Sequence, residues 1–219
     1  MELVRRYARP VGLGLILAGW LFLAYLFLFV APQMQAFGHD AFAYWNVSLP
    51  DPYGIPWLEL GSFNYAPPVA LIFDRFDAVE WGVFSFLWLM LVIGSVIWIG
   101  WSPIWILAAF AFPPVAMELY GLNIHVLLPV AIVLGFRHPW TWSFVLLTKP
   151  SAGVGLLWFV VRREWRQLFT ALGVTAALCL VSFAVVPSLW FDWMDAIVSN
   201  LGTPAPANAI DIPLWLRLG

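Results

Sequence analysis

Residues 38–68 read GHDAFAYWNVSLPDPYGIPWLELGSFNYAPP, and the rest of the chain is arranged around this stretch. It is a long polar and aromatic interval in a sequence that otherwise consists of one apolar run after another. Five of its residues are tyrosine or tryptophan, and five are proline. A connection of this length between compact elements is usually functional, because connections without a role tend to be short. We therefore expect a functional loop over residues 32–79.

The composition of the chain is that of an integral membrane protein. Hydrophobic residues make up 63% and charged residues 10%, whereas soluble domains are about 45–50% apolar and about 25% charged. The net charge of −2 and the lack of a basic stripe argue against a nucleic-acid partner. The single cysteine, Cys179, excludes a disulfide framework, and no cluster has metal-ligand spacing, so we expect neither a metal nor a cofactor.

The apolar runs predict an all-α, polytopic membrane protein with about seven membrane segments, some of them only half-length. A run of about twenty apolar residues can span a bilayer. We treat residues 1–219 as a single transmembrane domain, with a short interfacial helix near residues 65–78. The predicted crossings are residues 11–30, 81–101, 104–117, 126–136 and 168–186, with a short outer connection over residues 118–125.

Residues 140–161 form an unusual segment in which Lys149 and Pro150 interrupt an apolar run. Each limb would be ~14–18 Å of helix, about half of the ~30 Å hydrocarbon thickness. Either the segment is one crossing with a proline kink, or two short helices meet at Lys149. A continuous crossing would place Arg162 and Arg163 outside, against the usual distribution of basic residues, so we favour a broken hairpin.

Charge then orients the chain in the cell membrane, with a cytoplasmic N-terminus and an extracytoplasmic loop. On this topology seven of the ten basic residues lie inside and ten of the twelve acidic residues lie outside. The bias of the basic residues sets orientation, and the acidic bias is weaker support. The odd number of predicted membrane spans and the loop-like end DIPLWLRLG suggest a short form or a fragment of a longer protein.

Two charged residues are the main candidates for chemistry. Asp40 follows the first predicted crossing closely, where a carboxylate could act at the outer membrane surface; the alternative is a solvated loop aspartate, and His39 could orient it. Lys149 lies within an apolar run, where an ionisable residue is costly and usually functional. Its natural ligand would be a phosphate, and the alternative is a snorkelling lysine. Arg75 could also bind phosphate or simply join a surface ion-pair cluster.

Several of these motifs, in this order, resemble glycosyltransferase family 87 of the GT-C superfamily. The resemblance rests on Asp40 with Tyr44, on NYAPP at 64–68, on YGLNIHVLL at 120–128 and on LLTKPSAGVGLLWFVVRREWR at 146–166. Leu122 stands where that family has a glutamine. Members of the family are usually nearly twice as long, so the chain resembles an N-terminal half that a second chain or a C-terminal half would complete.

The resemblance implies transfer of a hexose, with mannose favoured, from a polyprenyl-phosphate sugar to a lipid or glycan acceptor at the extracytoplasmic face. Asp40 would be the general base and the transfer would invert the anomeric centre. The implied substrate-binding residues are His39, Tyr44, Tyr65, Arg75, Asn123, His125 and Lys149. Two alternatives remain: a non-catalytic transporter-like or partner subunit with a binding site at Lys149, and a truncated, inactive relative. Membrane lipids are the remaining expected partners.

Overall fold

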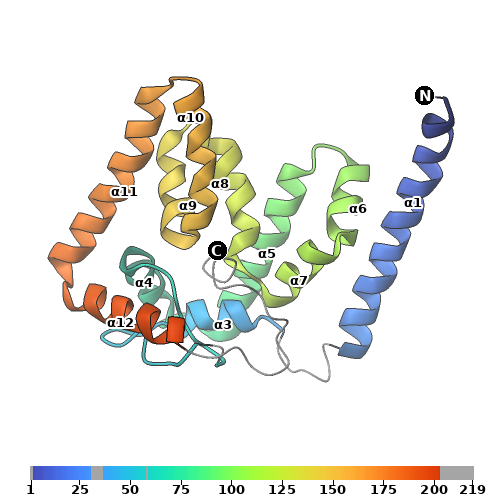
Figure 1. Cartoon of the computed structure of the whole chain (residues 1–219). Helices are drawn as coiled ribbons and strands as arrows, with labels where there is room; N and C mark the ends of the chain where they lie inside the picture. The colour runs from blue at the N-terminus through green and yellow to red at the C-terminus, as the bar shows by residue number, and fades with distance from the viewer. Residues whose placement is uncertain (1, 31–36, 58, 203–219) are drawn as a thin grey trace. The chain divides into compact units, whose positions relative to one another are not determined.

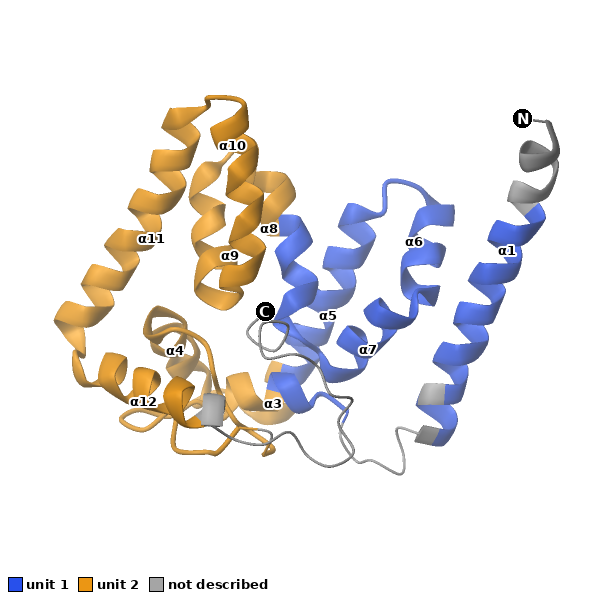
Figure 2. Ribbon diagram, in the orientation of Figure 1, with its two compact units in different colours: residues 1–41, 85–130 blue, residues 42–84, 131–219 orange. Residues whose placement is uncertain are grey.

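The computed structural model describes residues 2–30, 37–57 and 59–202, and every regular element in this part of the chain is a helix (Figure 1). The predicted all-α class is confirmed. Residues 32–36 and 58 of the predicted loop, and the C-terminal residues 203–219, lie outside the described residues. The chain divides into two compact units (Figure 2): residues 1–41 with 85–130 form unit 1, and residues 42–84 with 131–219 form unit 2.

Three helices are long and apolar enough to cross a membrane: Pro10–Phe29, Trp81–Ile99 and Trp165–Val185. A bent pair of helices, Pro103–Ala111 with Pro113–Gly121, would make a fourth crossing. Two further apolar helices, Ile124–Gly135 and Pro150–Val161, are shorter than a full crossing. The chain is therefore an all-α membrane protein, and the count of seven segments stays a prediction.

Unit 1 is built on α1 (Glu2–Tyr25), which continues as a π-helix η1 (Leu26–Val30). Helix α1 packs against α6 (Pro103–Ala111) at Gly19, where any side chain would overlap the backbone carbonyl of Ala111. The indole of Trp20 donates a hydrogen bond to the carbonyl of Leu107 (3.2 Å) in the same contact. The glycine allows the two helices to approach at backbone distance.

Unit 1 also contains a bend that the sequence analysis did not predict. Helix α6 ends at Ala111, and α7 (Pro113–Gly121) leaves it at 74°. The cause is Pro113–Pro114: proline has no N–H to continue the helical ladder and it forces the preceding residue out of the helical region. Phe112 is accordingly extended, with φ −76° and ψ 117°. The crossing predicted for residues 104–117 is therefore bent, and Glu118, which was assigned to the connection after it, lies in α7.

The remainder of unit 1 contains residues 85–99 of α5 (Trp81–Ile99), the 3-10 helix η3 (Ile124–Leu127) and the start of α8 (Leu128–Gly135). Helix α7 is followed by Leu122, which has the left-handed backbone conformation (φ 53°, ψ 45°). The carbonyl of Leu122 accepts a hydrogen bond from the indole of Trp88 in α5 (2.8 Å). This contact holds the turn between α7 and η3 against α5.

In unit 2 the polar and aromatic stretch folds around its own aromatic side chains. The stretch begins with a short helix, α3 (His39–Trp45), whose first three residues still belong to unit 1 and where the sequence predicts a loop. Tyr44 and Phe63 are almost completely buried, and they pack with Tyr65 and Phe73. The aromatic stretch is followed by α4 (Pro67–Phe73) and the 3-10 helix η2 (Asp74–Phe76). The structure therefore has short helices within residues 65–78, where the sequence predicts a short helix, and their position at the membrane interface stays a prediction.

The second part of unit 2 folds back on itself at Lys149. The elements are η4 (Pro139–Thr141), α9 (Trp142–Thr148), η5 (Pro150–Leu156), α10 (Leu157–Val161), α11 (Trp165–Val185) and α12 (Ser188–Gly202). A side chain at Gly155 would overlap the ring of Trp142, and one at Gly153 would overlap Leu146. These pairs bring η5 against α9 in antiparallel fashion. The two glycines therefore permit a tight hairpin over this segment.

Candidate active site

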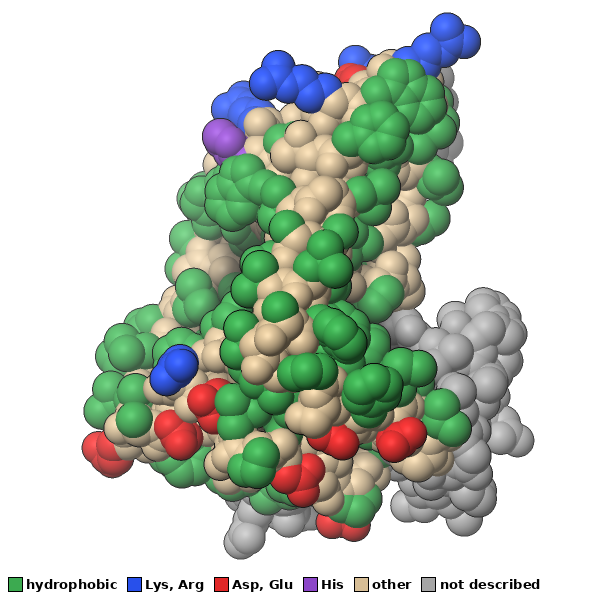
Figure 3. Space-filling view, turned by 90° about the vertical axis from the view of Figure 1, so that its left-hand side faces the viewer, with side chains coloured by type: hydrophobic (Ala, Val, Ile, Leu, Met, Phe, Trp, Pro, Cys, Tyr) green, Lys and Arg blue, Asp and Glu red, His purple; other side chains and the backbone are tan. Residues whose placement is uncertain are grey.

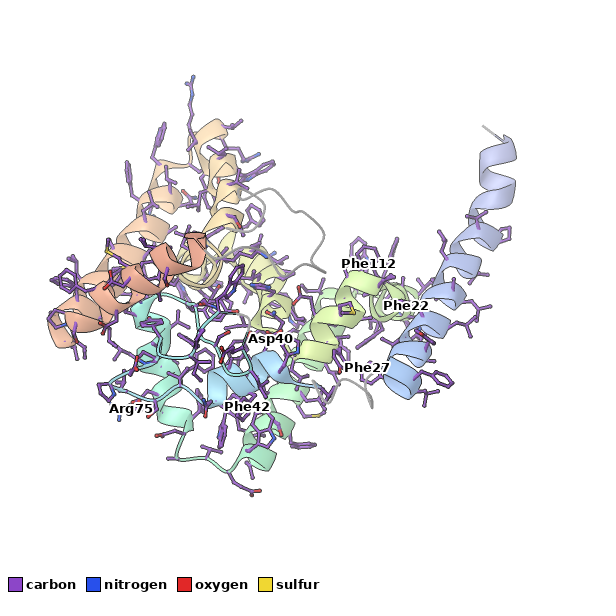
Figure 4. All side chains as sticks on the ribbon, turned by 60° about the horizontal axis from the view of Figure 1, so that its bottom comes forward. Phe22, Phe27, Asp40, Phe42, Arg75 and Phe112 are labelled. Atoms are coloured by element: carbon purple, nitrogen blue, oxygen red, sulfur yellow. The ribbon has the colours of Figure 1, made fainter. Side chains whose placement is uncertain are left out.

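Asp40 is held in unit 1 by the turn that precedes α3 (Figure 4). Gly38 has a positive φ of 73°, a conformation that glycine adopts at little cost. Its N–H donates a hydrogen bond to the carbonyl of Tyr120 near the end of α7 (2.9 Å). The backbone just before Asp40 is thus fixed to the end of α7, and the carboxylate follows within two residues.

Both oxygens of the Asp40 carboxylate have a partner. Asn123 Nδ2 donates a hydrogen bond to Asp40 Oδ2 (2.8 Å), and His39 Nε2 lies 3.3 Å from Asp40 Oδ1. The other end of the Asn123 amide is also fixed, because its Oδ1 accepts the backbone N–H of His125 (2.9 Å). An amide oxygen that accepts from the backbone leaves the NH₂ group to face the carboxylate. The network therefore determines the orientation of Asn123, and through it that of Asp40.

A second carboxylate and a second imidazole lie beside this network. Glu118 Oε1 is 3.7 Å from His125 Nδ1. Both residues act electrostatically on Asp40, Glu118 as a like charge and His125 as an opposite charge when protonated. The end of α7 and the turn after it thus bring two carboxylates, two imidazoles and one amide together within unit 1. We call this set the Asp40 cluster; its members are His39, Asp40, Glu118, Asn123 and His125. Such a set can accept, hold and pass a proton.

Burial raises the pKa of the Asp40 carboxyl above its ordinary value, because the charged form loses hydration. The imidazole of His39 and the hydrogen bond from Asn123 oppose this rise in pKa, and the charge of Glu118 adds to it. A raised pKa makes the ionised carboxylate a stronger base than a solvated aspartate. General bases in enzymes are commonly adjusted in this way.

The close approach of Asp40 to α7 depends on Gly121. A side chain at this position would overlap Asp40 Oδ2 and would come within 3.1 Å of His39 Cε1. Gly121 is the last residue of α7 and is itself buried. The carboxylate therefore occupies space that any other residue at position 121 would fill.

The other predicted site residues lie in unit 2. Tyr44 is 1% exposed, and its hydroxyl lies 3.2 Å from that of the half-buried Tyr65. The carbonyl of Tyr65 in turn accepts a hydrogen bond from the hydroxyl of Tyr53 (3.0 Å). These tyrosines are part of the aromatic core of unit 2, and a contact with substrate stays a prediction for both Tyr44 and Tyr65.

The two predicted phosphate-binding cations are also in unit 2. Arg75 lies in η2 and is exposed (Figure 4), and the neighbouring Asp74 accepts the backbone N–H of Leu49 (3.0 Å). Lys149 is half-buried at the break between α9 and η5. Within the described ranges, neither cation has an acidic partner within 4.0 Å. Both positions are therefore compatible with an anionic ligand.

Glu118 is the one member of the Asp40 cluster that the sequence analysis missed. It was counted among the residues of a short outer connection, yet it lies in helix α7 beside His125. The available signal was an acidic residue directly after the apolar run of residues 103–117, where a charge is costly and suggests function. In the part of the chain that the structure describes, no group of three His, Cys, Asp or Glu is arranged to hold a metal ion.

Comparison with known proteins places most of the chain in one family. The sequence model described as "Glycosyltransferase family 87" matches residues 63–214. The match includes Tyr65, Arg75, Asn123, His125 and Lys149, and it begins after His39, Asp40 and Tyr44. No curated protein and no solved structure matches the chain.

Proposed function

Because the chain belongs to glycosyltransferase family 87, and is thus a membrane glycosyltransferase, we propose that it transfers a hexose from a polyprenyl-phosphate sugar to a lipid or glycan acceptor. Mannose is the favoured sugar. The observation that carries the proposal is the Asp40 cluster: a half-buried carboxylate whose two oxygens are held by Asn123 and His39 and whose pKa is raised by burial. Such a group suits the single proton transfer that glycosyl transfer to a hydroxyl requires.

In the proposed reaction Asp40 is the general base. The acceptor hydroxyl oxygen forms a bond to the anomeric carbon while its proton moves to the Asp40 carboxylate. The bond between the anomeric carbon and the phosphate oxygen breaks, and polyprenyl phosphate leaves with the bonding electron pair. A single displacement of this kind inverts the anomeric centre. General base catalysis of this type typically contributes about 10²–10⁴-fold.

Lys149, with Arg75, is the proposed group that binds the donor phosphate. A cation fixed near the leaving oxygen stabilises the charge that develops there during bond breaking. Support comes from the position of Lys149 at a helix break in an apolar segment, with no acidic partner among the described residues. A lysine serves such a phosphate as a point charge.

The proposed location is the cell membrane, with the N-terminus in the cytoplasm and Asp40 on the extracytoplasmic side. For unit 2, Figure 3 supports an orientation in which α11 begins on the cytoplasmic side and α12 lies on the extracytoplasmic side. Basic side chains gather at the end where α11 begins, acidic side chains at the end near α12, and hydrophobic side chains cover the region between them. Basic residues are retained preferentially on the cytoplasmic side.

The decisive experiment replaces the proposed base. Membranes containing the chain are supplied with radiolabelled polyprenyl-phosphate mannose, and transfer to lipid is measured for wild type and Asp40→Asn. We expect Asp40→Asn to lower transfer by about 10²–10⁴-fold, whereas the matched loop variant Asp51→Asn retains wild-type transfer, because Asp51 is exposed. Equal transfer by wild type and Asp40→Asn would remove Asp40 from catalysis. Absence of transfer by wild type with every donor would favour the non-catalytic alternatives.

A further inference from the structure

Unit 1 contains a cavity of about 590 Å³ that borders the Asp40 cluster at Glu118 and His125. It lies between α5, α6 and α7 and reaches η3 and the first residues of α8. Its walls are mainly apolar and include Val96, Trp101, Trp105, Ala109 and Val115. Ligand sites typically have volumes of about 300–1,000 Å³ and apolar walls with few polar groups. The cavity is therefore large enough to hold an apolar chain.

Two of the residues that line the cavity are ionisable. Glu118 and His125 both face it, and they are 3.7 Å apart. Glu118 Oε2 is buried, and no hydrogen-bond donor from the described residues reaches it. A buried carboxylate oxygen without a donor is costly. Oε2 itself is closed to solvent, but the Glu118 side chain is 38% exposed and that of His125 is 23% exposed. The cavity thus offers a carboxylate beside an imidazole, in walls that otherwise favour hydrocarbon.

The charges of Glu118 and His125, which form the polar end of the cavity, decide which substrate fits. A hydroxyl group can donate to the accessible part of the Glu118 carboxylate and accept from His125, so it suits both side chains. A phosphate has only acceptor oxygens when ionised and is repelled by the carboxylate. The cavity therefore disfavours a lipid phosphate and favours an uncharged, hydroxylated end on an apolar chain.

We propose that this cavity binds the glycosyl acceptor, with its apolar chain between α5 and α6 and its hydroxylated end at Glu118 and His125. The proposal rests on the proposed transferase function, and it deepens that function by naming the chemical class of the acceptor. A chain of hydrogen bonds supports the proposal: the N–H of His125 donates to Asn123, and Asn123 donates to Asp40. The polar end of the cavity is thus next to the proposed base.

The first test measures binding without transfer. The full chain in lipid nanodiscs is irradiated with three probes that carry the same diazirine in their apolar chains: an uncharged alkyl mannoside, a polyprenyl phosphate and a phosphatidylglycerol. Mass spectrometry then maps the labelled residues. We expect the alkyl mannoside to label residues 95–115 about tenfold more than either anionic probe, and Glu118→Leu to remove most of this preference, as loss of one hydrogen bond to a charged group would. Glu59→Leu, which removes an exposed carboxylate in unit 2, should not change it.

Stronger labelling by polyprenyl phosphate would assign the cavity to the donor and would overturn the proposal. Equal labelling by all three probes would mean that bulk lipid fills the cavity, and this would overturn it too. The second test measures kinetics. Ala109→Phe should raise the KM for acceptor about tenfold or more with an unchanged KM for donor, whereas Ile104→Phe, on α6 but outside the cavity, should change neither.

The two tests separate failure of the inference from failure of the proposed function. A chain that is labelled by the alkyl mannoside but transfers no sugar contradicts the transferase proposal, and it leaves standing only the chemical class of the ligand, an uncharged and hydroxylated apolar chain. A chain that transfers sugar while Ala109→Phe and Glu118→Leu behave as wild type in both tests contradicts the cavity assignment alone.

Discussion

The turn at Asp40 in unit 1 and the helix break at Lys149 in unit 2 both place a charged group at an interruption between apolar helices, but their surroundings differ. Each oxygen of Asp40 has a partner within unit 1, in His39 and Asn123. Lys149 has no ion pair with any residue that the structure describes. A base must be oriented before the substrate arrives, whereas a cation that binds phosphate is completed by its ligand. The contrast therefore matches the different roles proposed for the two residues.

Removal of the Lys149 cation tests the second half of this contrast and should have the largest effect after that of Asp40→Asn. We expect Lys149→Ala to lower the transfer rate by about 10²–10³-fold, since a group that stabilises developing charge typically contributes this much. Lys149→Arg should recover part of the rate, because it retains the charge with a different geometry. The measurement is kcat with a saturating donor. Wild-type kcat for Lys149→Ala would mean that this lysine merely extends toward the membrane interface.

Removal of the amide that orients the base should have the next largest effect. We expect Asn123→Ala to lower kcat by about 10–100-fold, the loss that corresponds to one hydrogen bond to a charged group. This hydrogen bond lowers the pKa of Asp40, so its loss should move the acidic limb of the pH–rate profile to higher pH. Asn46→Ala, an exposed loop variant, is the control. A fall in kcat without this shift would indicate a structural role only.

A side chain at Gly121 should have a smaller effect. We expect Gly121→Ala to lower kcat by about tenfold. The new Cβ would occupy the space of Asp40 Oδ2 and would displace the carboxylate by up to about 1 Å. Gly94→Ala is the matched control, since a side chain at Gly94 meets nothing within 4 Å. Should both variants have the same kcat, the close contact between Asp40 and α7 would not matter for catalysis.

The smallest expected effect is on stability. Burial raises the pKa of Asp40 in the folded chain above its unfolded value of 3.8. The protonated carboxyl therefore stabilises the fold, and this contribution is complete at pH values below the unfolded pKa. The contribution is lost as the pH rises through the folded-state pKa. Asp40→Asn should therefore unfold at a temperature no lower than that of wild type at neutral pH. As the pH falls, the unfolding temperature of wild type should rise relative to that of the variant. Thermal unfolding in detergent measures this, and a variant that unfolds much earlier at neutral pH would contradict it.

The class of the protein was predictable from the sequence, because apolar content and run length report directly on membrane helices. The structure confirms the all-α membrane class. The bend at Phe112 was not predicted, although Pro113 and Pro114 are visible in the sequence, because the run of residues 104–117 was long enough to be taken as one crossing. As a result Glu118 was assigned to an outer connection and its place beside His125 was missed.

Four of the five residues of the Asp40 cluster were named from the sequence, namely His39, Asp40, Asn123 and His125, but their contacts were not predicted. Asp40 was named from its position after the first crossing, and Asn123 and His125 from a turn more than eighty residues later. The hydrogen bond between Asp40 and Asn123 joins residues 83 positions apart, and such contacts depend on how α1, α5 and α7 pack. The short helix α3 was missed because prolines, glycines and polar residues dominate the stretch that follows it.

Leu122 connects this packing to the site in an unexpected way. It adopts a left-handed backbone conformation that usually belongs to glycine, it is almost fully buried, and its side chain fills the space above Gly38. A glycine at this position would relax the backbone but empty the space, so the two effects have opposite signs. A substitution at Leu122 would therefore act on Asp40 indirectly, through the backbone of Gly38 that its side chain supports.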